Sequence, residues 1–148
     1  MIEGMVLLVE DNRDDVDLTL HSLKKNRITN KIEVLRDGAQ AIDYFFGPGA
    51  TERQMPIVML LDLKLPKISG LDVLRRVRAD PRTRRLPVVI LTSSNEERDR
   101  ATGYDNGANS YICKPVDQEQ FNDAINQLGL YWLLLNVPPP DSILTSSP

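Results

Sequence analysis

Short, nearly continuous apolar runs alternate along this chain with segments whose apolar residues recur at helical spacing. Runs rich in Val, Ile and Leu are typical of strands that are buried on both faces of a parallel sheet. Their strict alternation with helices predicts a doubly wound α/β fold. The expected strand–helix pairs are 5–9 with 13–25, 31–35 with 38–46, 57–61 with 70–79, 87–91 with 95–105, and 109–113 with 117–135.

Size and composition narrow the class of protein. The chain has 148 residues, 41% of them hydrophobic and 26% charged, which indicates one soluble globular domain. A net charge of −3 argues against a nucleic-acid partner. No apolar run approaches the ~20 residues that a membrane helix needs. The single cysteine, Cys113, and the lack of a signal peptide fit a cytoplasmic protein, and we expect this thiol to be buried in the fifth strand.

The last two expected helices differ from the others. Residues 95–100 are all polar, and Ala101 and Tyr104 add little apolar surface, so we expect a loosely held fourth helix that is able to move. The last helix can be capped by Asp117 and keeps its apolar spacing to about residue 136. We expect a proline-rich, disordered tail over 138–148.

Functional-looking polar residues follow the apolar runs of four expected strands. They are three acids, Glu10, Asp11 and Asp62, the hydroxyl of Thr92 and the amine of Lys114. Ligands of open parallel sheets bind outside the carboxyl ends of the strands, so these groups are expected to meet in one crevice. Carboxylates suit a hard cation such as Mg²⁺, and the hydroxyl and amine can stabilise phosphoryl oxygens.

Most of these residues have a plainer interpretation when each is taken alone. The acidic turn from Asp11 to Asp15 can simply start a helix, Thr92 can bond to backbone, and Lys114 can be a solvated lysine. Asp62 weighs against these interpretations, because a carboxylate after five apolar residues is costly unless it is paired or liganded. A neutralised carboxylate of this kind can act as a nucleophile and form an acyl phosphate. Pro115 can form a tight turn that aims Lys114 inward.

Taken together, the motifs resemble the receiver domain of two-component response regulators. The matching pieces, in family order, are Val9-Glu10-Asp11, Leu61 to Pro66 with Gly70, Leu91-Thr92-Ser93, and Tyr111 three residues before Lys114-Pro115. The resemblance covers about residues 5–128 within one expected domain, 1–137. It implies a flavodoxin-like (βα)5 fold with strand order 2-1-3-4-5.

The resemblance also implies a role for each site residue. Asp62 would accept a phosphoryl group from a sensor histidine kinase, and Thr92 and Lys114 would hold that group. The residues that would hold Mg²⁺ are Glu10, Asp11, Asp62 and Lys64, the last through its backbone carbonyl. Tyr111 would be the switch aromatic, rotating inward as Thr92 moves and so changing the face formed by the fourth helix, fifth strand and fifth helix.

Two positions influence the lifetime of the phosphoryl group in this family, and they correspond here to Lys64 and Ser94. Neither is a water-activating acid or amide, which implies slow self-dephosphorylation. The chain is therefore expected to catalyse only its own phosphoryl transfer and this slow loss, and to be no enzyme in any wider sense.

The residues after the receiver core indicate how the protein would pass on its signal. About twenty residues follow it, too few for a DNA-binding domain, so we expect the output to be protein–protein contact. Residues 127–140 resemble the end of small stand-alone regulators that partner bacterial phytochromes and related sensor kinases. Apolar residues on both faces of the last helix suggest a homodimer through it. The alternative is an extended core helix lying across the domain.

Other functions remain open at this point. One is a degenerate receiver that binds partners without phosphorylation, against which the full set of acids, Thr92 and Lys114 argues. Another is a phosphatase with an aspartyl nucleophile, which would need a second Asp where this chain has Lys64. The arginine-rich segment 75–85 is interpreted as a solvated face, and His21 as a surface residue.

Overall fold

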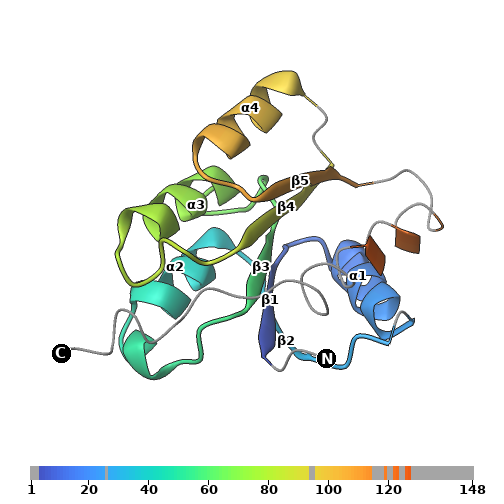
Figure 1. Ribbon diagram of the computed structural model, residues 1–148, viewed down its shortest axis with the longest axis horizontal. Coiled ribbons are helices and arrows are strands. Elements are labelled where there is room, and N and C mark those ends of the chain that lie inside the picture. The colour runs from blue at the N-terminus through green and yellow to red at the C-terminus, as the bar shows by residue number, and fades with distance from the viewer. Residues whose placement is uncertain are drawn as a thin grey trace.

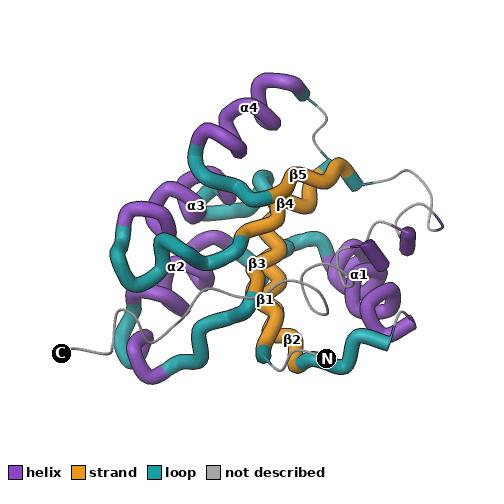
Figure 2. Tube along the Cα trace, viewed as in Figure 1, coloured by secondary structure: helices purple, strands orange, loops and turns teal. Residues whose placement is uncertain are grey.

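A single parallel sheet forms the centre of the molecule. The computed structural model describes residues 4–25, 27–93 and 96–114, together with 119, 122–123 and 126–127. The strands lie in the order β2-β1-β3-β4-β5, and every pair is parallel, which confirms the predicted topology. Their bounds are β1 Met5–Val9, β2 Lys31–Leu35, β3 Val58–Leu61, β4 Val88–Thr92 and β5 Ser110–Cys113 (Figure 2).

Helices cover both faces of this sheet. Figure 1 shows α2, α3 and α4 on one side and α1 on the other. Their bounds are α1 Arg13–Lys25, α2 Gly38–Phe46, α3 Gly70–Ala79 and α4 Glu97–Asp105, with a short 3-10 helix, η1 Ala50–Glu52, after α2. The expected last helix over 117–135 lies mostly outside the described residues, as do Pro115, Ser94 and the expected tail 138–148.

The continuous apolar runs of β1, β3 and β4 are explained by burial on both faces of these central strands. Because side chains alternate along a strand, Leu7 and Val9 of β1 join a core cluster with α2 and α3. Val6 and Leu8 of the same strand join a second cluster with Val16 and Leu23 of α1. All five residues of β1 are buried, so an exposed polar face of the kind seen in many antiparallel sheets is missing from this strand.

The fourth helix is thinly packed, as its composition predicts. Gly103 is its one buried residue, and a Cβ atom there would lie 2.8 Å from the Cδ1 atom of Ile90 and 3.4 Å from the ring of Tyr111. Helix α4 therefore rests on β4 and β5 through a residue that has no side chain. A helix with so little buried apolar surface has a small barrier to displacement.

Two expectations about single residues are wrong. Cys113 is exposed, because it is the last residue of β5, an edge strand of the described sheet. Arg78 is half-buried and does not belong to a solvated face. Its guanidinium donates to the carbonyl of Gly107 (2.7 Å from Nη2) and to that of Leu86 (2.6 Å from Nη1), and burial lowers its pKa. It thereby joins α3 to the loop before β5.

Candidate functional site

The carboxyl ends of four strands bring the predicted site residues to one edge of the sheet. In register, Val9 of β1 pairs with Leu61 of β3, and Thr92 of β4 pairs with Cys113 of β5. The residues that follow these positions therefore share one edge, which is the edge expected from the topology. The residues placed there are Glu10, Asp11, Asp62, Thr92 and Lys114.

Three carboxylates form the centre of this edge. Oxygen atoms of Glu10, Asp11 and Asp62 all lie within 4.8 Å of one another. Glu10 is 2% exposed and Asp62 is 7% exposed, whereas Asp11 faces solvent. Two buried carboxylates beside an accessible one form a hard oxygen site with an open side, which suits a divalent cation that keeps part of its water shell.

Local backbone contacts hold these acids in place. The Glu10 carboxylate accepts a hydrogen bond from the backbone N–H of Asn12 (3.2 Å), and the backbone N–H of Glu10 donates to the carbonyl of Leu35 (2.9 Å). The backbone N–H of Lys64 lies 3.4 Å from Asp62 Oδ1. Asp62 is thus fixed by the turn that follows β3 as well as by the strand itself.

Lys114 supplies the positive charge of the site. Its ammonium group forms ion pairs with Glu10 and with Asp15 (2.8 Å), and its Nζ atom lies 3.8 Å from Asp62 Oδ2. The Lys114 side chain is 9% exposed, so this charge is nearly buried. The sequence pointed to Lys114 but assigned Asp15 only to the start of a helix. Sequence alone does not tell which acid of the first turn of α1 faces inward.

Thr92 and Tyr111 lie between this edge and α4. Thr92 is fully buried at the end of β4, and Tyr111 is half-buried on β5, where it pairs in register with Ile90. The Tyr111 ring reaches the position over Gly103 where α4 meets the sheet. The two residues that the resemblance implies as a switch are therefore on adjacent strands, between the acids and the thinly packed helix.

Comparison with known proteins identifies the family of this chain. A model of the response regulator receiver domain family matches residues 6–126. The chain belongs to this family. It is a two-component response regulator that depends on phosphorylation.

Three solved structures are similar to this receiver. The Mn²⁺-bound form of response regulator Rcp1 has a TM-score of 0.86 at 31% identity and covers 93% of this chain and 99% of that one; Rcp1 comes from Synechocystis sp.. Phosphorylated cyanobacterial phytochrome response regulator RcpA has a TM-score of 0.87 at 32% identity, with the same coverage. Bacteriophytochrome response regulator RtBRR is 48% identical, with a TM-score of 0.73, and covers 97% of this chain and 88% of that one.

The electrostatics of the receiver site follow from burial. The pKa of the Glu10 carboxyl is raised to about 7, mainly because burial disfavours its charged form; the hydrogen bond to Lys114 opposes the rise and the charge of Asp62 adds to it. For Lys114, burial lowers the pKa, but the hydrogen bonds to Asp15 and Glu10 outweigh this effect and leave the pKa raised. The lysine therefore stays charged, while the crowded carboxylates have a surplus of negative charge that a cation relieves.

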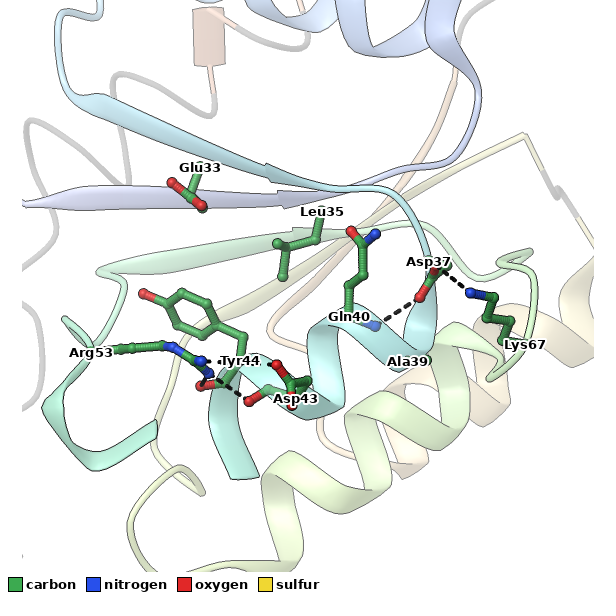
Figure 3. A pocket seen from close by; sticks show the side chains of 9 residues that line it. All are labelled: Glu33, Leu35, Asp37, Ala39, Gln40, Asp43, Tyr44, Arg53 and Lys67. Atoms are coloured by element: carbon green, nitrogen blue, oxygen red, sulfur yellow. Dashed lines mark hydrogen bonds and ion pairs between the residues drawn. The ribbon is translucent and has the colours of Figure 1, made fainter. Parts of the chain in front are cut away.

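A separate hollow lies between β2 and α2. It has a volume of about 450 Å³ and is lined by residues of β2, α2, the segment after η1 and the β3–α3 loop (Figure 3). Four of its charged groups form two ion pairs, with Lys67 at 3.4 Å from Asp37 and Arg53 at 3.8 Å from Asp43. Asp37 also caps α2 by accepting from the N–H of Gln40 (2.7 Å), which lowers its pKa. The hollow therefore belongs to the support of α2 and lies apart from the acidic site.

None of the helices in the described part of the chain has the length and apolar character needed to cross a membrane.

The glycine at the start of α3, Gly70, packs closely against the backbone of Asp62. A Cβ atom on Gly70 would lie 2.1 Å from the carbonyl oxygen of Asp62 and 2.8 Å from Cα of Leu63. Both are backbone atoms that cannot rotate away. Gly70→Ala is therefore expected to lower the free energy of unfolding by about 2–3 kcal/mol, measured by urea denaturation.

Gly49→Ala is the matched control for this prediction. Nothing lies within 4 Å of a Cβ atom there, and its φ of 77° leaves only the strain of a left-handed residue, about 1 kcal/mol. Equal losses in the two variants would contradict the assignment of a packing role to Gly70.

Proposed function

We propose that Asp62 is the phosphoacceptor of this response regulator and receives its phosphoryl group from a sensor histidine kinase. The observation that carries this proposal is the setting of Asp62, a 7% exposed carboxylate with an ammonium group 3.8 Å away and two other carboxylates beside it. In the reaction, a carboxylate oxygen of Asp62 bonds to phosphorus. The P–N bond of the kinase phosphohistidine breaks, and its electron pair stays on the leaving imidazole.

The metal of this reaction is proposed to be Mg²⁺. Side-chain oxygens of Glu10, Asp11 and Asp62, with the backbone carbonyl of Lys64, would hold it, because Mg²⁺ prefers hard oxygen ligands and retained waters. The Mn²⁺-bound form of Rcp1 supports a divalent cation in a receiver of this type. Bound Mg²⁺ would neutralise charge on the phosphoryl oxygens during transfer.

Thr92 and Lys114 are proposed to hold the phosphoryl group once it is on Asp62. Lys114 is charged and lies close to Asp62. Thr92 is the last residue of β4, the strand that pairs with β3, which Asp62 follows. Movement of Thr92 toward the phosphoryl oxygens would open space into which Tyr111 rotates. Because α4 contacts the sheet mainly through Gly103, over the Tyr111 ring, such a rotation would displace α4 and remodel the α4–β5 face.

The kinase partner is proposed to be of the phytochrome type. RcpA is a cyanobacterial phytochrome response regulator and RtBRR is a bacteriophytochrome response regulator, and both are similar to this chain over most of its length. We further propose that residues 1–137 act as one receiver in the cytoplasm. Its output would be a protein–protein contact rather than catalysis on a separate substrate, without nucleic acid or membrane as a partner.

Two other functions fit the site less well. A degenerate receiver that binds partners without phosphorylation does not need three converging acids and a buried lysine. A phosphatase with Asp62 as its nucleophile would need a second acid two residues later, where the exposed Lys64 stands.

Phosphorylation of Asp62 can be measured directly by intact-protein mass. After incubation with Mg²⁺ and acetyl phosphate, the wild-type chain is expected to gain one phosphoryl group, because Lys114 lies near enough to Asp62 to balance negative charge on the oxygens of the transferring phosphoryl group. Asp62→Asn is expected to gain none, and EDTA is expected to abolish the gain in the wild type. A wild-type chain that stays unmodified would favour the phosphorylation-independent binding module.

We propose a homodimer through the expected last helix, because apolar residues occur on both of its expected faces. This segment lies mostly outside the described residues. Light scattering after size-exclusion chromatography, with and without beryllofluoride and Mg²⁺, is expected to give the mass of two chains in at least one of the two states. Leu134→Glu, which places a charge within the expected last helix and off the apolar stripe that is expected to face the sheet, is expected to reduce this mass to one chain. A monomer in both states would refute the dimer.

A further inference from the structure

The ammonium group of Lys114 lies among three carboxylates that hold it unequally. It donates hydrogen bonds to Glu10 and to Asp15, the latter at 2.8 Å, whereas Asp62 Oδ2 at 3.8 Å is beyond hydrogen-bond distance. An ammonium carries three N–H donors and no acceptor. Two donors are thus engaged, and the third is left for the side of the group where Asp62 lies.

Asp15 differs from the other partners of Lys114. It is not one of the three acids whose oxygens form the candidate metal cluster, Glu10, Asp11 and Asp62. The Glu10 carboxylate is shared between the lysine and that cluster, but the Asp15 carboxylate is not. Asp15 therefore offers Lys114 a hydrogen bond that does not compete with the metal site.

The side chain of a lysine is a flexible chain of four carbons, so its ammonium group has no fixed position unless hydrogen bonds hold it. One bond to Glu10 would leave the group free to swing about that contact. A second hydrogen bond, to Asp15 of α1, removes this freedom. The remaining donor then faces the gap toward Asp62, which a phosphoryl oxygen on Asp62 would occupy.

We propose that Asp15 is a positioning residue for phosphoryl transfer: it holds the Lys114 ammonium so that its free N–H donor faces the phosphoryl group on Asp62. This inference rests on the proposed role of Asp62 as the acceptor. It extends the site by a residue of α1 that does not touch the reacting atoms.

The alternative role for Asp15 is to stabilise the N-terminus of α1 by its charge. Acids in the first turn of a helix stabilise its N-terminus, and both Asp14 and Asp15 are placed there in α1. Asp14 is exposed and is not among the carboxylates within 4.0 Å of Lys114 in the described residues. Asp14→Ala therefore removes the same helix charge as Asp15→Ala and leaves the lysine contact intact.

The test compares the rate of phosphorylation by acetyl phosphate in the wild type, Asp15→Ala, Asp15→Asn and Asp14→Ala. We expect Asp15→Ala to be slower by about tenfold, since displacing a charged donor at a reacting centre has effects of this order or larger. Asp15→Asn keeps an acceptor and is expected to lose less. Asp14→Ala is expected to stay near the wild-type rate. Mg²⁺ affinity, measured by calorimetry, is expected to change by less than about twofold in all variants, because neither acid is in the metal cluster.

A double-mutant cycle with Lys114→Ala separates positioning from other effects. In the Lys114→Ala background, adding Asp15→Ala is expected to cause no further fall in the rate of phosphorylation. Slow variants are followed over longer times, and their affinity for beryllofluoride is measured as a second readout. Equal rates for Asp15→Ala and Asp14→Ala, or an undiminished effect of Asp15→Ala in the Lys114→Ala background, would overturn the inference. A wild-type chain that takes up no phosphoryl group would instead refute the proposed function itself.

Discussion

The arrangement on which the site depends is the burial of two carboxylates beside one ammonium at the edge of the sheet. Glu10 and Asp62 are nearly inaccessible, and so is Lys114, which lies 104 residues after Glu10 in the chain. A buried carboxylate without an opposite charge is strongly destabilising. The three groups meet only when β1, β3 and β5 are in their observed order, so the topology of the sheet and the electrostatics of the site require each other.

The same arrangement separates a rigid part of the molecule from a movable one. Strands β1, β3 and β4 are buried throughout, and Gly70 packs against the backbone of Asp62, so the acceptor has little freedom. Helix α4 is different, because its one buried residue is Gly103. A change in charge at the rigid edge can therefore be expressed as a shift of the weakly held helix, since closely packed cores transmit strain while thin contacts yield to it.

Much of this was predictable from sequence, for reasons of periodicity. The limits of β2, α1, α2 and α3 match their predictions, because apolar spacing and breaks at Gly and polar residues mark them clearly. Convergence of Glu10, Asp11, Asp62 and Lys114 follows from where parallel strands end. The contact of Asp15 with Lys114 was not predictable, because helical pattern does not fix which of several neighbouring acids faces a distant lysine.

Two further residues show why local pattern fails. Arg78 stands among five other arginines in the segment 75–85, and nothing in that run distinguishes the one whose guanidinium bonds to the carbonyls of Gly107 and Leu86. Cys113 ends an apolar strand, yet it is exposed because β5 is at the edge of the described sheet. Both outcomes depend on contacts between segments far apart in sequence.

The most direct test of the account is a crystal structure of the chain grown with Mn²⁺ and beryllofluoride. We expect an anomalous peak among the side-chain oxygens of Glu10, Asp11 and Asp62, and beryllofluoride bonded to Asp62 within reach of Lys114. A metal bound elsewhere, or beryllofluoride absent from Asp62 while the metal is present, would contradict the claim that this edge of the sheet is a phosphoacceptor site.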